Sequence, residues 1–261
     1  MNVGANARNA GAATAKTSVA TRVSRLTRLT FHLFRGLYIL LRHFPHQTER
    51  RHGKEIRRWS RQLLAILGMR ARTINMPGAW PERCMLISNH ISWVDVFAIL
   101  SVRHCVFVAK SEIRDWPFIG RLVAEVGTLF IERAKRSDAR RANERIAAAL
   151  NDGRIIAVCP EGTTNATHQL LKFHAALFQP AIEARATLQP VGLRYLDAAG
   201  HPSFAAAYIG DQTLLGSIWA IASEPRMVVE LRFGPTVDAT EGDRRGLAEE
   251  TRTIVSALLE G

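Results

Sequence analysis

From residue 70 onward the chain alternates short apolar runs with longer amphipathic segments, and this alternation is the feature that most limits how it can fold. Short apolar runs are typical of strands, and the longer segments between them are typical of helices packed on a sheet. The sequence therefore predicts an α/β domain with a mixed, mostly parallel sheet flanked by helices. The predicted strands cover residues 71–75, 84–88, 105–109, 128–132, 155–159, 188–195 and 226–233.

Signals at the ends of the intervening segments place several helices. Residues 137–150 are predicted to form one, which Gly153 stops, and residues 240–259 to form the last. Another helix is expected to open at Asp115. A chain of 261 residues with 47% hydrophobic composition can bury one large core, so we expect a single α/β domain over residues 70–261.

The N-terminal part differs from the rest in composition. Residues 1–21, rich in Ala, Thr and Asn, are predicted to be disordered, and they lack the apolar stretch of a secretory signal. The apolar segment 29–41 contains an Arg and a His and is shorter than the roughly 20 residues that a transmembrane helix needs. With the helical stretch 49–69 it predicts a two-helix, membrane-interfacial element over residues 22–69.

Arginines flank the apolar faces of these two predicted helices, and the chain as a whole has a formal net charge of +12. Such a charge favours an anionic partner, either a membrane surface with acidic lipids or a nucleic acid. The alternative is that the arginines form a solvated face on helices that pack against the core. The arginines concerned are Arg22, Arg25, Arg28, Arg35, Arg42, Arg50, Arg51, Arg57, Arg58 and Arg61.

The three cysteines, Cys84, Cys105 and Cys159, each lie in an apolar run. Their number is odd, and their spacing fits neither a C-x-x-C motif nor a Cys/His metal site. They are predicted to be buried free thiols in a reducing compartment, so a catalytic site in this chain is expected to face the cytoplasm.

A histidine and an aspartate five positions apart, His90 and Asp95, stand where the predicted strand 84–88 gives way to a helix. Both are therefore expected at the carboxyl edge of the sheet, where open α/β sheets bind ligands. An Asp that accepts from one imidazole nitrogen leaves the other as a general base for a substrate hydroxyl, without a covalent intermediate on the protein. The alternative is a purely structural pair, a strand-ending His with a helix-capping Asp.

A second polar turn, Glu161-Gly162-Thr163, follows the strongly apolar predicted strand 155–159. Backbone N–H groups in such a turn can hold a phosphate, or the oxyanion that forms when a thioester carbonyl is attacked. The alternative is a tight connection from strand to helix. Two polar turns, each at the end of a predicted strand, favour a functional site over a purely structural connection.

Two cations, Lys110 and Arg133, follow two further predicted strands. Cations at the ends of neighbouring strands can converge on a phosphate or another acidic headgroup, although a single strand-end Lys or Arg is usually solvated. Together with the His–Asp pair and the Gly-containing turn, they form a pattern that is more specific than any one of its elements.

These motifs, in this order, resemble the glycerolipid and lysophospholipid acyltransferases, whose prototype is 1-acylglycerol-3-phosphate acyltransferase. The resemblance covers about residues 60–235. The family fold is an α/β domain preceded by a two-helix membrane-docking element, which agrees with the expectation from the residues alone. The four motifs are Asn89-His90 with Asp95, Lys110-Ser111-Glu112 with Gly127 to Arg133, Pro160-Glu161-Gly162-Thr163, and Gln189-Pro190-Val191.

The resemblance implies a role for each motif. His90 would remove the proton from the acceptor hydroxyl, which then attacks an acyl thioester, and Asp95 would orient the imidazole. The residues implied in substrate binding are Lys110, Arg133, Glu161, Gly162 and Thr163. Those implied to line the core near the acyl channel are Gln189, Pro190 and Val191.

The implied reaction is O-acylation of a lysophospholipid, in which 1-acylglycerol-3-phosphate becomes phosphatidic acid. One departure bears on the acceptor, because the family's third motif commonly continues with Arg and this chain has Thr164. That loss, together with the segment 171–178, resembles the branch that acylates lyso-ornithine lipid and related lysolipids. Both acceptors stay open, and Lys172 or Lys110 is the candidate to replace the missing charge.

The remaining expectations concern partners and location. The acyl donor is a thioester of acyl-carrier protein or coenzyme A, used as a co-substrate, and no cofactor or metal is implied. The enzyme is expected at the cytoplasmic face of the inner membrane, as a peripheral or monotopic protein. A nucleic-acid partner is not expected, since the basic residues stand beside Leu, Phe and Trp. The alternatives of another class are a nucleic-acid-binding protein and a non-catalytic membrane-binding protein, and intact His90 and Asp95 argue against the latter.

Overall fold

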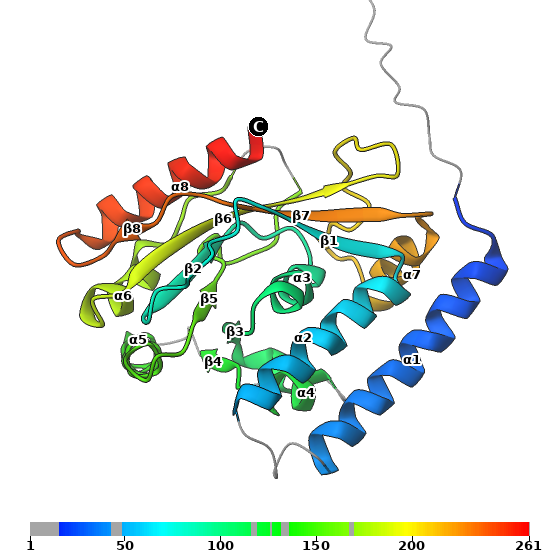
Figure 1. The fold of residues 1–261 in the computed structure, drawn as a ribbon, viewed down its shortest axis with the longest axis horizontal. Helices are drawn as coiled ribbons and strands as arrows, with labels where there is room; N and C mark the ends of the chain where they lie inside the picture. Colours follow the sequence, from blue (N-terminus) through cyan, green and yellow to red (C-terminus); the bar gives the residue numbers. More distant parts are fainter. Residues whose placement is uncertain are drawn as a thin grey trace, which may run out of the picture.

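The computed structural model describes residues 16–42, 49–115, 119–125, 127–131, 136–166 and 170–260. An eight-stranded sheet forms its centre (Figure 1). Along the path β1-β7-β6-β2-β5-β3-β4, every neighbouring pair is parallel except β6 and β7, and β8 pairs antiparallel with β6. The predicted mixed, mostly parallel sheet is confirmed. The strands are β1 Met69–Ile74, β2 Cys84–Ser88, β3 Val106–Lys110, β4 Leu129–Ile131, β5 Ile156–Val158, β6 Thr187–Leu196, β7 Met227–Phe233 and β8 Val237–Asp238.

Helices cover both faces of this sheet and divide the core in two. On one face α1, α2, α3 and α7 bury their apolar side chains, and on the other face α5, α6 and α8 do so (Figure 1). The described residues also form two 3₁₀ helices, η2 Ser111–Asp115 and η3 Ala175–Phe178. The α-helices are α1 Val19–Arg42, α2 Glu49–Ile66, α3 Val94–Val102, α4 Ile119–Glu125, α5 Arg136–Asn151, α6 Gln179–Glu183, α7 Leu214–Ser223 and α8 Arg244–Glu260.

The central strand β2 shows why the sheet forms in this way. All five of its residues are buried, and alternate side chains enter opposite cores: Cys84 and Leu86 belong to one, Met85 and Ile87 to the other. A continuous apolar run is what a parallel strand covered on both faces requires. The sequence prediction for residues 84–88 therefore coincides with the observed strand.

Local hydrogen bonds and backbone angles move several predicted boundaries. The helix predicted over 49–69 ends at Ile66, because Gly68 adopts a φ of 80° that terminates it, and Met69 already opens β1. The helix α1 begins at Val19 rather than 22, since the Ser18 hydroxyl accepts from the N–H of Thr21. Residues 1–15 of the segment predicted to be disordered lie outside the described residues.

The last helix also begins later than predicted. Asp243, not Thr240, caps α8, since its Oδ1 accepts from the N–H groups of Arg245 at 2.7 Å and Gly246 at 3.2 Å. The helix start expected at Asp115 falls in the 3₁₀ helix η2, and residues 116–118 lie outside the described residues. The two-residue strand β8 had no counterpart in the prediction.

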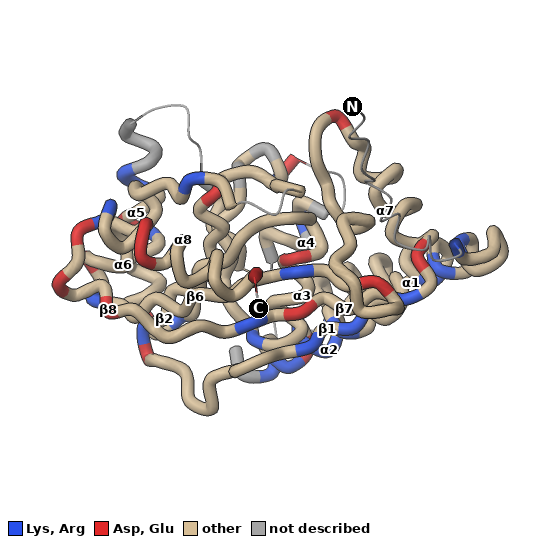
Figure 2. The backbone as a smooth tube through the Cα atoms, turned by 90° about the horizontal axis from the view of Figure 1, so that it is seen from above, with Lys and Arg blue, Asp and Glu red and all other residues tan. Residues whose placement is uncertain are grey.

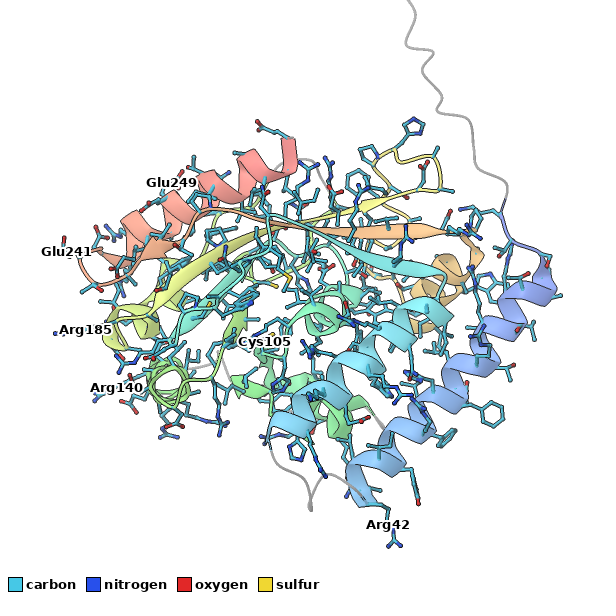
Figure 3. All side chains as sticks on the ribbon, in the orientation of Figure 1. Arg42, Cys105, Arg140, Arg185, Glu241 and Glu249 are labelled. Atoms are coloured by element: carbon cyan, nitrogen blue, oxygen red, sulfur yellow. The ribbon has the colours of Figure 1, made fainter. Side chains whose placement is uncertain are left out.

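The N-terminal helices are joined closely to the α/β domain. Leu63, Leu64 and Leu67, in and just after α2, are each 1% exposed and belong to the same core as strands β6 and β7. Within the described residues, no helix combines the length and the hydropathy that crossing a bilayer requires. Figure 3 shows Cys105 inside the molecule, whereas labelled charged residues such as Arg140 and Glu249 lie at its periphery.

Candidate active site

The carboxyl ends of β2, β5, β3 and β4 lie side by side and carry the predicted site. Strands β2 and β5 pair in parallel, with Ile87 opposite Val158, so the segments that follow them, which contain His90 and Glu161, are neighbours. Strand β3 follows β5 in the sheet and ends at Lys110, next to β4. Arg133 and the side chain of Lys110 lie outside the described part of the chain. Their roles remain predictions.

The predicted His–Asp pair is in direct contact. His90 Nδ1 lies 2.8 Å from Asp95 Oδ2. Because a carboxylate only accepts hydrogen bonds, Nδ1 carries the hydrogen, and the lone pair of the neutral imidazole is on Nε2. The His90 side chain is 24% exposed, whereas that of Asp95 is 1% exposed. This is the arrangement of a general base with a buried orienting carboxylate.

Asp95 is fixed by more than its histidine. It stands in the first turn of α3, and its Oδ2 also accepts from the backbone N–H groups of Ile91 at 2.7 Å and Ser92 at 2.9 Å. The other carboxylate oxygen, Oδ1, accepts from the hydroxyl of Tyr195 at 2.6 Å. A buried carboxylate with four donors is satisfied without water and has one available orientation.

Tyr195, which lies in β6, was not predicted as a site residue. Its side chain is buried, and burial, the charge of Asp95 and the hydrogen bond to it together raise the pKa of Tyr195 well above its ordinary value. The phenol therefore stays protonated and remains a donor. Since Tyr195 and Asp95 are 100 positions apart, only the sheet order brings them together.

Glu161 holds the backbone of His90 instead of facing a ligand. It is 4% exposed, its Oε1 accepts from the N–H of His90 at 2.9 Å, and its Oε2 accepts from the N–H of Leu171 at 3.0 Å. Burial raises its pKa, against these hydrogen bonds and one from the side chain of Asn165. In return, the N–H of Asn165 donates to the His90 carbonyl at 2.7 Å. The role that the structure gives to Glu161 is to position the histidine segment.

The turn after Glu161 presents fewer free donors than expected. Gly162 has a φ of 72°, a conformation that favours glycine, and its N–H donates to the carbonyl of Cys159 at 3.1 Å. That N–H is therefore committed to the turn. Thr163, by contrast, is exposed and borders the cavity described below.

Two contacts connect this site to a part of the chain that sequence reasoning left out. The Thr164 hydroxyl donates to the carbonyl of Tyr208, whose own N–H donates to the carbonyl of Ile91 at 3.0 Å. At the start of α3, Trp93 Nε1 donates to the hydroxyl of Ser217 in α7 at 3.1 Å. The segment before α7, and α7 itself, are thus attached to the residues that carry the His–Asp pair.

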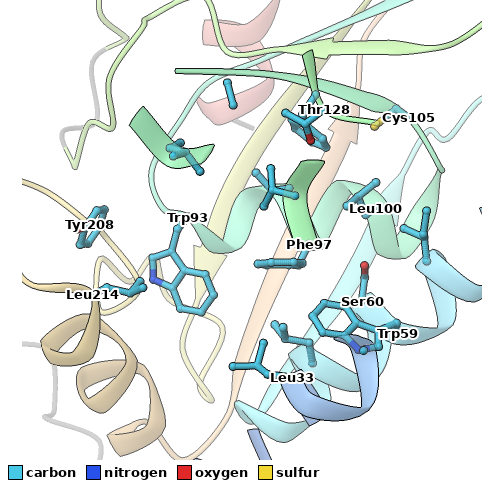
Figure 4. A pocket seen from close by; sticks show the side chains of 18 of the residues that line it. Leu33, Trp59, Ser60, Trp93, Phe97, Leu100, Cys105, Thr128, Tyr208 and Leu214 are labelled. Carbon is cyan, nitrogen blue, oxygen red and sulfur yellow. The ribbon is translucent and has the colours of Figure 1, made fainter. Parts of the chain in front are cut away.

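A cavity of about 680 Å³ lies against His90. Its walls come from α1, α2, α3 and α7 as well as from the turn at Thr163, and they are mostly apolar, as Leu33, Trp59, Phe97 and Leu214 illustrate (Figure 4). This volume and lining suit a ligand with a long hydrocarbon part.

The predicted fourth motif lies elsewhere. Gln189, Pro190 and Val191 are buried in β6 and are absent from the described walls of the cavity. Gln189 Nε2 donates instead to the carbonyl of Gly234 at 2.8 Å. Likewise, Lys172 is exposed and does not line the cavity. The three residues of the fourth motif thus belong to the sheet, and Lys172 belongs to the surface. None of the four is among the described residues that line the cavity.

A fixed imidazole beside an apolar cavity, on an α/β sheet with N-terminal helices, is the arrangement expected of an enzyme that activates a hydroxyl for attack on a lipid-like substrate. A family model described as "Acyltransferase" matches residues 72–194. The chain is 32% identical over 245 residues to "1-acyl-sn-glycerol-3-phosphate acyltransferase" of Neisseria gonorrhoeae, covering 94% of this chain and 95% of that protein. It is 34% identical over 204 residues to "Lyso-ornithine lipid O-acyltransferase" of Pseudomonas aeruginosa, covering 78% and 77%.

Its fold is similar to the crystal structure of the 1-acyl-sn-glycerophosphate (LPA) acyltransferase PlsC from Thermotoga maritima. That comparison has a TM-score of 0.70 and 21% sequence identity, and it covers 92% of this chain and 94% of that one. The chain belongs to the acyltransferase family and is an acyltransferase. The resemblance stated from the motifs is confirmed.

Proposed function

We propose that the protein transfers a fatty acyl group from an acyl thioester to the free hydroxyl of a lysolipid. The observation that supports this most directly is the His90–Asp95 pair beside an apolar cavity of about 680 Å³. The base accounts for activation of a hydroxyl, and the cavity accounts for a substrate with a hydrocarbon chain.

The proposed chemistry needs one base and no covalent enzyme intermediate. His90 Nε2 takes the proton of the acceptor hydroxyl while the oxygen attacks the thioester carbonyl, and Asp95 stabilises the imidazolium that results. The tetrahedral intermediate collapses, the carbon–sulfur bond breaks, and the leaving thiolate receives the proton from His90. The products are an ester and a free thiol. An acyl thioester is the co-substrate, and this sequence of steps uses no further cofactor.

Our first candidate acceptor is 1-acylglycerol-3-phosphate, which would give phosphatidic acid. The Neisseria gonorrhoeae relative named for this substrate aligns with 94% of the chain, including the N-terminal helices. Lys110 and Arg133 are the proposed phosphate ligands, because Lys110 ends β3, the neighbour of β5, and Arg133 comes two positions after the end of β4, the neighbour of β3. Thr163, which is exposed at the cavity, would complete the headgroup site, and Gly162 would shape the turn that presents it.

A second candidate acceptor is lyso-ornithine lipid, and one observation favours it. Where the family commonly has an Arg, this chain has Thr164, and the Thr164 hydroxyl donates a hydrogen bond to the carbonyl of Tyr208. A neutral residue already engaged in the fold offers no charge to a phosphate. The Pseudomonas aeruginosa relative carries the corresponding name at 34% identity.

We further propose that the reaction takes place on the cytoplasmic face of the cell membrane, with acyl-carrier protein or coenzyme A as the thiol carrier. The exposed apolar and cationic residues of α1 support membrane contact. The three free cysteines support a reducing compartment.

Acyl transfer from labelled acyl-carrier protein and acyl-coenzyme A to a panel of lysolipids tests the proposal. The panel contains lysophosphatidate, lyso-ornithine lipid and a neutral lysolipid, and each is assayed with the wild type and with His90→Ala. Product from lysophosphatidate alone identifies a phosphatidate-forming enzyme. Product from lyso-ornithine lipid alone explains Thr164. Turnover that is independent of His90, or absent across the panel, would contradict the proposed function.

A further inference from the structure

Exposed apolar side chains gather on α1, on α7 and on the segment between β6 and α7. On α7, Leu215 is 79% exposed and Trp219 is 41% exposed, one helical turn apart. On α1 they recur at helical spacing along one face. This set, named the outer apolar face, comprises Val19, Val23, Phe31, Phe34, Tyr38, Leu41, Phe204, Ile209, Leu215 and Trp219.

The two helices of the outer apolar face are fastened to each other. Thr17, just before α1, donates through its N–H to the carbonyl of Ser223 at 2.8 Å, and Arg25 Nη1 donates to the carbonyl of Ala222 at 3.0 Å. The guanidinium of Arg22 lies 5.5 Å from the ring centroid of Trp219. The two helices therefore lie against each other (Figure 1).

The inner sides of the same two helices line the cavity. Leu29 and Leu33 of α1 contribute to its wall, and so do Leu214 and Ile218 of α7. Leu214 in Figure 4 stands at the cavity next to Trp93, the residue that bonds to α7 through Ser217. The outer apolar face is thus separated from the cavity and its histidine by the thickness of these helices.

The helix α2 contributes differently from what the sequence predicted. Its large apolar side chains are buried or half-buried, and in the described residues none of them is among the exposed large hydrophobics. Its outward positions are cationic: Lys54, Arg58 and Arg61 are exposed. The helices of the outer apolar face are therefore α1 and α7, whereas α2 contributes exposed cationic side chains.

We propose that α7 is a second membrane-insertion element, and that it docks together with α1 on a bilayer surface containing anionic lipids. The inference rests on the proposed function, since it names the surface from which that function would take its lipid. The charge of α1 favours a bilayer as the binding partner of the outer apolar face. Arg28, Arg35 and Arg42 are exposed at intervals of seven residues along α1, next to its apolar stripe. Apolar and aromatic side chains beside arginines match the boundary between acyl chains and anionic headgroups.

A double variant, Leu215→Ser with Trp219→Ser, tests the role of α7 by cosedimentation with vesicles of phosphatidylethanolamine and phosphatidylglycerol. Both side chains are exposed, so the fold is expected to persist, which thermal unfolding checks. The matched control is Met76→Ser, which removes a 43% exposed apolar side chain from the β1–β2 connection. We expect the double variant to bind vesicles roughly tenfold or more weakly than the wild type, and Met76→Ser to bind as the wild type does.

Binding of the double variant equal to that of the wild type overturns the proposal, and so does a wild-type chain that fails to bind these vesicles at all. The second result would assign the outer apolar face to a protein partner. The measurement contains no substrate, so it decides the role of α7 whether or not acyl transfer is found. Turnover of a short-chain lysolipid dispersed in detergent, with and without the double substitution, reports on the proposed function separately.

Discussion

At the scale of single residues, Asp95 has the most complete set of contacts in the site. Its two oxygens accept from one imidazole, two backbone amides and one phenol, and none of the four distances exceeds 2.9 Å. Such a carboxylate fixes both the tautomer and the orientation of His90. The orientation of the proposed base therefore depends on groups from the segment between β2 and α3 and from β6.

Replacing His90 by Ala is expected to lower the rate of acyl transfer by roughly 100-fold or more, because it removes the base that accepts the hydroxyl proton. Stability should change little, since the ring borders a cavity and its loss opens no closed core volume. Initial rates and thermal unfolding measure the two effects. An Ala variant with wild-type rates would show that another group takes the proton.

Tyr195→Phe is expected to lower kcat while leaving the KM for the acceptor close to that of the wild type. The phenol touches Asp95 and does not line the cavity, so it acts on the base and not on substrate binding. Loss of the donor leaves a buried carboxylate oxygen unpaired, which costs about 1–3 kcal/mol of stability. Steady-state kinetics beside urea unfolding separates the two effects. A loss of stability with unchanged kcat would show that the role of Tyr195 is only structural.

A third prediction concerns Ser60, whose buried hydroxyl lines the cavity and, within the described residues, forms no hydrogen bond. A buried hydroxyl without a partner is destabilising, and Ala is a better helix former than Ser. Ser60→Ala is therefore expected to raise the free energy of unfolding by about 1 kcal/mol. Denaturant titration measures this, and a loss of stability would mean that the hydroxyl has a partner, such as a water molecule.

The sequence was sufficient for His90 and Asp95 because their relation is local, five positions apart at the end of an apolar run. It could not supply Tyr195, whose contact with Asp95 depends on β6 lying next to β2. Glu161 was predicted as a site residue on its motif, but the direction of its side chain depends on burial. That direction, toward the N–H of His90, follows only from the packed turn.

At the scale of elements, three strands meet at one buried carboxylate. Glu230 of β7 is fully buried and is paired in register with Arg72 of β1 and Arg194 of β6, and it also bonds to Arg232 of its own strand. Burial by itself would raise the pKa of Glu230, but the hydrogen bonds from Arg232, Arg72 and Arg194 hold it below its ordinary value. The ionised carboxylate thus joins β1, β7 and β6.

Glu230→Gln is expected to lower the free energy of unfolding by about 3–5 kcal/mol at neutral pH, because three arginines lose the charge that they surround. Since the folded-state pKa is depressed, this stabilisation is present above the ordinary pKa of 4.5 and is lost as the pH falls through the lower folded value. The difference between variant and wild type should therefore shrink in acid. Urea unfolding at several pH values measures it, and a difference that is independent of pH would contradict this account.

Elements with strong local signals were predicted well. The strand over residues 84–88 was found as predicted, because a short, continuously apolar run between polar turns has few alternatives. The error at Met69 arose because α2 and β1 are both apolar there, and only the positive φ of Gly68 separates them. The strand β8 has two residues, too few for any periodicity, and exists through its pairing with β6.

At the scale of the whole molecule, the net charge of +12 is concentrated where the N-terminal helices lie. Figure 2 marks Lys and Arg positions along α2 and β1. Lys54, Arg57, Arg58 and Arg61 of α2 border a shallow surface cavity of about 270 Å³. A cationic helix next to an exposed apolar one combines long-range attraction to anionic lipids with short-range insertion.

Raising the salt concentration is expected to weaken the binding of the wild type to anionic vesicles strongly, since each exposed cation near such a surface contributes roughly 1 kcal/mol and salt screens this attraction. Binding to neutral vesicles should be weaker from the start and nearly independent of salt. Cosedimentation over a salt series with both kinds of vesicle measures the two contributions. Equal binding to anionic and neutral vesicles would show that electrostatic attraction does not contribute to membrane binding.

The three thiols have a practical consequence for following this molecule on a membrane. Burial raises the pKa of Cys84 and of Cys159 to about 12, and that of Cys105 is raised as well. Maleimides and spin-label reagents react with the thiolate form of cysteine. The native cysteines should therefore react with them only very slowly at neutral pH. A single cysteine placed at residue 215 would then report its own depth in the bilayer without removal of any native thiol.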